Sequence, residues 1–184
     1  TGANNTAVGY NSLCKNTTGC RNTAIGLGVL KCNVTGLRNT GVGYASLVNN
    51  TANNNSALGY DSLVLNTSGA DNVAIGHCSL RANTTASNNT SVGSYSLQAN
   101  TTGTPNVAVG NFSLCANTTG ASNTLVGTDA GQAITTGEQN IIIGHDAGDS
   151  LTDADFNVAI GYQALTSDTL GSRSVAIGRT ALFS

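Results

Sequence analysis

The sequence predicts an all-β fold, a parallel β-solenoid of eleven coils of about 17 residues each. A five-residue motif, for example Asn157-Val158-Ala159-Ile160-Gly161, recurs eleven times, and its closing glycines are 17 residues apart except for one step of 16. Within the motif, β-branched residues alternate with small ones, as in a strand with two different faces. The density of Gly and Asn, without a sustained 3.6-residue period, excludes helices. The repeat glycines are Gly9, Gly26, Gly43, Gly59, Gly76, Gly93, Gly110, Gly127, Gly144, Gly161 and Gly178.

The period runs through the whole chain without a break. We therefore expect residues 1–184 to form a single repeat array rather than two domains. The chain starts inside one repeat at Thr1-Gly2 and stops inside another at Ala181-Leu182-Phe183-Ser184. These ends are expected of a section of a longer protein or of a processed piece.

Each predicted strand comprises the three residues before a repeat glycine. The residue just before the glycine is aliphatic, the one two positions earlier is mostly β-branched, and a small residue separates them in nine copies. We expect the branched face to form the core, and the face of Ala and Gly to let a second backbone come close. The predicted core residues are Val8, Ile25, Val42, Leu58, Ile75, Val92, Val109, Val126, Ile143, Ile160 and Ile177.

A leucine lies four residues after the repeat glycine in nine copies. In the eighth and ninth copies the residue there is Gly131 or Gly148, and the same copies carry Leu125 and Ile142 in the otherwise small column. We expect the side-chain volume that is lost at one position of these coils to be restored at the other.

A polar corner, Asn-Thr-Thr-Gly in several copies, follows the leucine. Asn and Gly tolerate the left-handed conformations that a tight corner needs. We expect hydrogen bonds between the backbones of stacked coils and between stacked asparagine side chains. A coil-to-coil spacing of about 4.8 Å would give a rod roughly 50 Å long. The corners also contain sequons that a secretory route could glycosylate. Examples are Asn16, Asn66, Asn100 and Asn117.

Each coil offers little apolar volume, since the chain has three Phe and no Trp or Met. At roughly 25 cal/mol per Å², burial within one coil is small compensation for ordering its residues. We therefore expect sister chains to pack against the Ala–Gly face, as a homotrimer with three rolls about one axis.

Charged residues make up only 9% of the chain, against roughly 25% in an ordinary domain. The net charge of −2 argues against a nucleic-acid partner. The sequence contains no run of 18 apolar residues, so we expect no membrane insertion of this segment. Basic residues gather in the first three copies and acidic residues in the later ones, a distribution that solvated loops explain.

The position after the repeat glycine holds the candidate ligand contacts Tyr10, Tyr44, Tyr60 and Tyr162. Exposed tyrosines along a rod could stack on sugar rings and hydrogen-bond through their hydroxyls, or they could simply cover the end of the core. His77 and His145 occupy the same column four coils apart, about 19 Å, too far to share a metal within one chain.

A local acidic cluster offers oxygen ligands suited to Ca²⁺ but lacks the spacing of an EF-hand loop, so solvated carboxylates are the preferred interpretation. It comprises Asp146, Asp149, Asp153 and Asp155. No nucleophile motif, paired general base or phosphate-binding glycine loop occurs. We therefore predict no metal site, no cofactor and no enzymatic activity.

The cysteines form no CxxC pair and no metal-ligand spacing. Cys14 and Cys32 lie one coil apart and could approach one another. We interpret most of the five as small apolar fillers. They are Cys14, Cys20, Cys32, Cys78 and Cys115.

Two late repeats carry a resemblance. Asn157-Val158-Ala159-Ile160-Gly161 with Ala164-Leu165, and Ser174-Val175-Ala176-Ile177-Gly178 with Ala181-Leu182, resemble the head repeat of trimeric autotransporter adhesins, the YadA-like head. Copies such as Asn5 to Leu13 are also similar to repeats of phage and large-virus fibre proteins. The resemblance covers essentially the whole chain. It implies a left-handed parallel β-roll that is trimeric, displayed outside a cell or on a virion, and used for attachment.

The leading hypothesis is therefore a non-enzymatic fibre or adhesin segment, extracellular, on a cell surface or on a virion. It would act as a rigid trimeric rod for attachment or spacing, with a cell-surface glycan or receptor as partner and many copies of one surface supplying avidity. One alternative is a structural filament that grows end to end. Another is an ice-binding solenoid with a threonine ladder eight residues after the glycines. That ladder comprises Thr17, Thr51, Thr67, Thr84, Thr101, Thr118 and Thr135.

Overall fold

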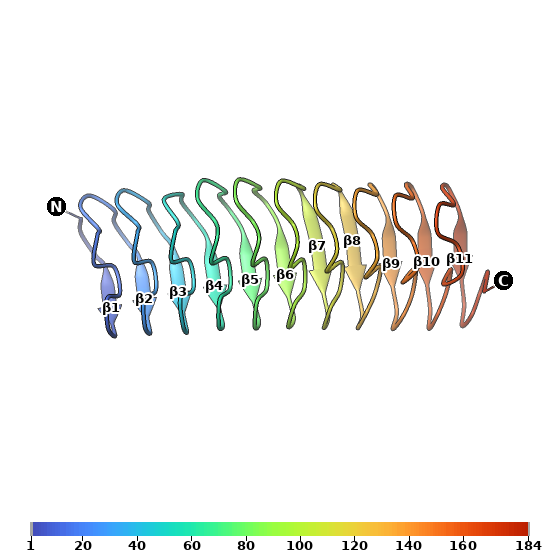
Figure 1. Cartoon of the computed structure of the whole chain (residues 1–184), viewed down its shortest axis with the longest axis horizontal. Coiled ribbons are helices and arrows are strands. Elements are labelled where there is room, and N and C mark those ends of the chain that lie inside the picture. Colours follow the sequence, from blue (N-terminus) through green and yellow to red (C-terminus); the bar gives the residue numbers. More distant parts are fainter. Residues whose placement is uncertain (1, 184) are drawn as a thin grey trace.

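The computed structural model describes residues 2–183, which form a rod of coils stacked along its long axis (Figure 1). All strands of this part of the chain belong to one parallel sheet, in which each strand pairs only with its sequence neighbours. The predicted parallel β-solenoid with coils of about 17 residues is confirmed. The strands are β1 Thr6–Val8, β2 Thr23–Ile25, β3 Thr40–Val42, β4 Ser56–Leu58, β5 Val73–Ile75, β6 Thr90–Val92, β7 Asn106–Val109, β8 Asn123–Val126, β9 Ile141–Ile143, β10 Val158–Ile160 and β11 Val175–Ile177.

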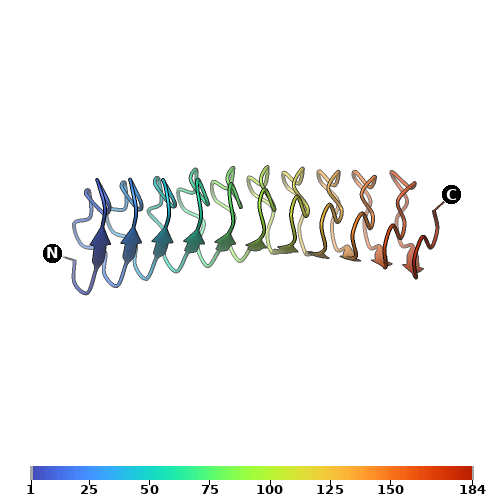
Figure 2. The same ribbon diagram turned by 90° about the horizontal axis from the view of Figure 1, so that it is seen from below.

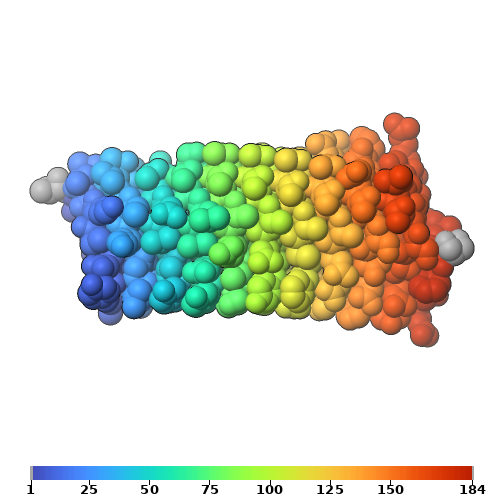
Figure 3. Space-filling view, viewed as in Figure 1, coloured from blue at the N-terminus to red at the C-terminus, as the bar shows by residue number. Residues whose placement is uncertain are grey.

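The strands line one long face of the rod, and the loops form the rest of each coil (Figure 2). In the space-filling view the coils follow one another as bands across the rod, in sequence order from β1 to β11 (Figure 3). Each coil therefore contacts the coil before it and the coil after it, as expected of a repeat array.

The register does not drift along the sheet. Equivalent repeat positions pair in every step, for example Val73 with Thr90. The coil that is one residue shorter keeps the same register, because Thr40 still pairs with Ser56. The corner of this coil is one residue shorter. Asn39 donates to the carbonyl of Ala52, 13 residues away, whereas the equivalent bond from Asn72 to Ala86 spans 14 residues.

The repeat glycines are the points of closest approach between coils. Their φ angles lie between 120° and 144°, a region that L side chains rarely adopt. A Cβ on Gly76 would also collide with the carbonyl oxygen of Gly93 in the next coil. The second backbone that the sequence leads us to expect beside this column is thus the next coil of the same chain.

The core lies on the opposite face of the strands from the one that the sequence predicts. The small residue in the middle of the strand points inward, and Ala24, Ala74 and Ala108 are fully buried. The leucine column lies in the same interior, where Leu80 is also fully buried. Because the coil is narrow and the leucine fills it, only a methyl group fits beneath the strand.

The prediction that the aliphatic column before the glycines forms the core is therefore wrong, because its side chains lie on the outside of the single chain. Seven are exposed, namely Val8, Ile25, Leu58, Ile75, Val126, Ile143 and Ile177, and four are half-buried, namely Val42, Val92, Val109 and Ile160.

The leucines of the core adopt a left-handed backbone conformation. Their φ angles lie between 49° and 57°, which costs about 1–2 kcal/mol for a residue with a Cβ. Full burial of a leucine side chain returns about 1.5–3 kcal/mol. Gly131 and Gly148, at φ of 54° and 56°, take the same conformation without that cost.

The exchange of volume that the sequence predicts in the eighth and ninth coils is present. A Cβ on Gly131 would overlap the Cδ2 atom of Leu125, and a Cβ on Gly148 would lie 2.9 Å from the Cδ1 atom of Ile142. The sequence analysis missed a third partner of this exchange. Ile134, fully buried, takes the corner position that an asparagine has in the preceding coils.

Two columns of buried asparagines bond the coils together. At the start of the strands, the backbone N–H of Asn72 donates to Asn55 Oδ1 at 3.0 Å. At the corner, Asn83 Nδ2 donates to Asn66 Oδ1 at 2.8 Å. The corner column stops at Asn117, whose Oδ1 has no partner among the described residues because the next coil has an isoleucine there. These ladders satisfy polar groups that would otherwise be buried without partners.

The single chain also buries as much surface as a globular protein of its mass. Its accessible surface is 7563 Å², against about 8200 Å² expected for 18.4 kDa. Small residues and asparagine ladders bring the coils close together, so the chain is compact in total area although each coil contains little apolar volume.

Candidate functional site

The outer face of the sheet is an uncharged strip, which we call the outer strip. One of its two columns is aliphatic throughout, and the other mixes Thr and Ser with Val and Ile. The strip consists of the side chains one and three positions before each repeat glycine, on β1 to β11. None of them is charged. Ile177 is 67% exposed near one end, and Ile75 is still 39% exposed in the middle of the rod. The second column of the strip is Thr6, Thr23, Thr40, Ser56, Val73, Thr90, Val107, Thr124, Ile141, Val158 and Val175.

The strip runs the length of the sheet. Scattered apolar residues are normal on a protein surface, but a contiguous apolar band is typical of an interaction face.

Aromatic side chains form a second column, just after the repeat glycines. Tyr44 and Tyr60 stack with ring centroids 4.8 Å apart and an angle of 7° between the planes. The column continues through His77, Tyr95 and Phe112 with centroid distances between 4.9 and 5.3 Å, and the contact of His77 with Tyr95 is edge-on, at 71°. Two of the four candidate tyrosines are thus brought together in one ladder of five rings.

The other two candidate tyrosines lie apart from this ladder. Tyr10 is 74% exposed and has Leu27 beside it in the next coil. Tyr162 stacks on His145 at 5.7 Å, and the guanidinium of Arg179 lies 5.8 Å from its ring centroid.

The stacking limits what these rings can offer a ligand. The inner faces of Tyr44 and Tyr60 cover one another, so a sugar ring has no access to the surface that lies between them. What the ladder presents outward is ring edges and hydroxyl groups. The geometry therefore favours hydrogen bonds from the tyrosine hydroxyls over stacking of sugars on ring faces.

The threonine ladder uses its hydroxyl hydrogens within the rod. Thr67 Oγ1 donates to the carbonyl of Thr84 at 3.0 Å, and Thr101 Oγ1 donates to that of Thr118 at the same distance. The same bond recurs in Thr17, Thr51, Thr84 and Thr118, whereas the hydroxyl of Thr135 donates to Asp153 at 2.7 Å. These hydroxyls are committed to the coil-to-coil ladder, so no observation favours the ice-binding alternative.

The sequons lie in the buried corner ladder. Asn66, Asn100 and Asn117 are fully buried and donate to neighbouring coils, and Asn16 is half-buried. Because a glycan needs the side-chain nitrogen of its asparagine, three of these four positions cannot carry one in the folded rod.

The acidic cluster of the sequence does not converge. Asp153 accepts hydrogen bonds from Thr135 Oγ1 at 2.7 Å and Thr136 Oγ1 at 2.9 Å, and these bonds lower its pKa. Asp155 accepts from the backbone N–H of Glu138. Burial raises the pKa of Asp149.

The fourth carboxylate of that cluster meets a different set of residues. Asp146 Oδ2 lies 3.0 Å from Nδ1 of His145, and Asp129 of the preceding coil joins them. Sequence reasoning missed Asp129, although its distance of one repeat from Asp146 places both in one column. His77 lies four coils away, as expected.

The five cysteines are unpaired. Cys14 Sγ donates to the carbonyl of Lys31 rather than contacting Cys32. Burial raises the pKa of the Cys78 and Cys115 thiols, which favours their protonated form.

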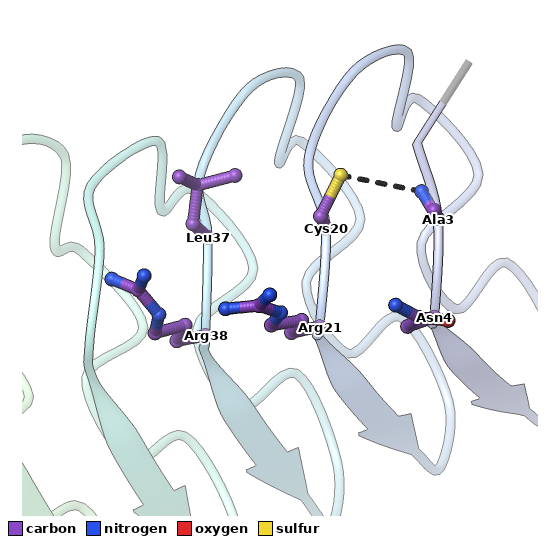
Figure 4. Close-up of a pocket in the computed structure, with 6 residues that line it drawn as sticks. All are labelled: Ala3, Asn4, Cys20, Arg21, Leu37 and Arg38. Carbon is purple, nitrogen blue, oxygen red and sulfur yellow. Dashed lines mark hydrogen bonds between the residues drawn. The ribbon is translucent and has the colours of Figure 1, made fainter.

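A shallow pocket of about 280 Å³ lies beside the first strands. Figure 4 shows Arg21 and Arg38, from neighbouring coils, extending in the same direction beneath Cys20 and Leu37. Cys20 accepts a hydrogen bond from the backbone N–H of Ala3. Both arginines occupy left-handed corner positions. The pocket is shallow and open to solvent.

Residues 2–183 contain no helix long and apolar enough to cross a membrane. Comparison of the chain with protein-family models, with curated proteins and with solved structures returned no match.

Proposed function

We propose that the chain is a non-enzymatic rod segment of a trimeric fibre or adhesin, displayed outside a cell or on a virion, that spaces or attaches what it carries. Three copies would set their outer strips against one another about a common axis. The left-handed winding of a β-roll, implied by the resemblance to adhesin heads, belongs to the same proposal.

The observation that carries this proposal is the outer strip. It carries no charge, its column next to the repeat glycines is aliphatic along the whole sheet, and in the single chain Ile75 and its equivalents remain in contact with water. The strip is only two side-chain columns wide, about 7 Å. Three such narrow strips can close around an axis, each covering its two neighbours.

The same packing would explain why the column just before the repeat glycines is aliphatic although it lies outside the core of one chain. Val, Ile and Leu are conspicuous just before the repeat glycine because they would form the core of the assembly. The Ala–Gly face, which the sequence assigns to the sister chains, is already occupied by the chain's own coils.

Attachment would use the sides of the rod that stay exposed. The aromatic ladder offers the hydroxyls of Tyr44, Tyr60 and Tyr95, and their repetition in three chains would multiply weak contacts. A glycan or receptor on a cell surface is the partner that this arrangement fits.

The mass in solution tests the trimer. We expect light scattering coupled to size exclusion to give three times 18.4 kDa for the full chain. Replacing two strip residues, Ile75→Asp with Val92→Asp, should yield monomers because six carboxylates would be buried around the axis. The control is Leu65→Asp, an exposed apolar residue outside the strip, which should leave the trimer intact.

A folded monomer of the wild-type chain at micromolar concentration would contradict the proposal, as would a double variant that remains trimeric. A trimer that binds nothing on a glycan array would reduce the function to spacing.

A further inference from the structure

Asp129, His145 and Asp146 bring three metal-ligating atoms together on the surface of the rod. One imidazole nitrogen and two carboxylate oxygens all lie within 4.8 Å of one another. The repeat explains the placement, since both aspartates stand two positions after a repeat glycine in adjacent coils. We infer that these side chains bind a divalent transition-metal ion, for which Zn²⁺ is the representative.

Charge is the first argument. The two carboxylates are stacked at the spacing of neighbouring coils, about 4.8 Å, where they repel one another. Among the described residues no lysine or arginine forms an ion pair with either of them. The side chain of Asp146 is only 20% exposed, so water screens it incompletely. A divalent cation between the two would remove the repulsion.

The orientation of the imidazole is the second argument. Nδ1 of His145 faces Oδ2 of Asp146 at 3.0 Å, and its ring is stacked on Tyr162. Nε2 of Gln163 lies 3.4 Å from the same carboxylate oxygen and helps to hold it. An ion would take the place of the hydrogen that bridges the imidazole and the carboxylate.

The donor set selects the class of ion. Imidazole nitrogen favours zinc and its neighbours over Ca²⁺ or Mg²⁺, which prefer sets of oxygens only. Three protein ligands leave a fourth position for water.

The same three repeat positions occur four coils earlier without the same result. There Asp61 and His77 stand at the positions of Asp129 and His145, and Cys78 stands at the position of Asp146. Asp61 lies 3.9 Å from Nε of Arg81, which neutralises it. Among the described residues, the ligand atoms of Asp61, His77 and Cys78 do not all lie within 4.8 Å of one another, as those of Asp129, His145 and Asp146 do. The chain thus contains its own comparison site.

Titration calorimetry of the full chain with ZnCl₂ tests the inference. We expect one Zn²⁺ per chain, and a loss of affinity of about tenfold or more in His145→Ala and in Asp129→Asn, since even loss of an outer-shell partner has that effect. The matched control His77→Ala, which removes the chain's other histidine, should bind as the wild type does. CaCl₂ should compete weakly.

Several outcomes would overturn the inference: no binding of Zn²⁺, equal losses in His77→Ala and His145→Ala, or Ca²⁺ binding as tight as that of Zn²⁺. If a variant does not fold by circular dichroism, the ring signals of the two histidines in the wild-type chain decide. Zn²⁺ should shift the His145 signals and leave those of His77 in place, and the reverse pattern would refute the site.

Discussion

The coil that contains β5 and the coil that contains β8 follow the same backbone path but build their cores in opposite ways. In the β5 coil, Ala74 lies beneath the strand and Leu80 fills the interior. In the β8 coil, Leu125 extends from the strand into the space above Gly131. The difference shows that the backbone sets a fixed interior volume, and that either wall of the coil can supply the side chain that fills it.

The corner of the coil takes part in the same exchange. Asn83 in the β5 coil belongs to the polar ladder, whereas the equivalent residue of the β8 coil is the buried Ile134. The ladder ends there, and Oδ1 of Asn117 has no partner within residues 2–183. A second apolar core therefore costs the rod one hydrogen bond between neighbouring coils.

The largest effect is expected from mixing the two kinds of core. Leu125→Ala alone should cost about 2–5 kcal/mol of unfolding free energy by leaving a cavity, and Gly131→Leu alone about 1–3 kcal/mol or more by overpacking. Combining both with Ile134→Asn should return the stability to within about 1 kcal/mol of wild type, because the β8 coil then has the core of the β5 coil. Urea unfolding followed by circular dichroism measures these differences.

The reverse exchange in the β5 coil is the control for that experiment. Ala74→Leu with Leu80→Gly and Asn83→Ile should be tolerated far better than Ala74→Leu alone. Single changes that simply add up to the combined effect would show that the two cores are not interchangeable.

The second effect concerns the asparagine ladder. Asn83→Ala and Asn117→Ala each leave the Oδ1 atom of the preceding asparagine unpaired, at a cost of about 1–3 kcal/mol. Asn83→Ala also removes the acceptor used by Asn100, so it should be the more destabilising by about 1 kcal/mol. Thermal unfolding of the two variants side by side measures the difference, and equal costs would mean that the ladder does not act as a chain of bonds.

The smallest effect is a dependence on pH in the eighth and ninth coils. Hydrogen bonds from Thr135 and Thr136 hold the pKa of Asp153 below its ordinary value of 3.8. A carboxyl whose pKa is lower in the folded state stabilises the fold above its unfolded pKa, and loses that contribution as the pH falls through the folded pKa. Between pH 5 and about pH 2 the wild type should therefore lose slightly more stability than Asp153→Asn, as melting temperatures measured across this range would show. Parallel curves for the two proteins would contradict the assignment.

Part of the candidate site was visible in the sequence, and part was not. The tyrosine column could be read from the period, as could the separation of His77 and His145. The contact between Asp129 and His145 depends on the in-register stacking of coils, which becomes apparent only when residues 17 positions apart are treated as neighbours. The stacking of Tyr44 on Tyr60, which closes their ring faces to a ligand, could not be predicted, because it depends on side-chain rotamers.

By itself the sequence determined the number and spacing of the coils, the place of each strand, and the exchange of Leu125 with Gly131. Period and composition are enough for these features. Only the tertiary structure decided which face of the alternating strand points inward. Alternation gives every strand two faces, and the width of the coil, already filled by leucines such as Leu80, leaves room for the methyl of Ala74 and places Ile75 outside.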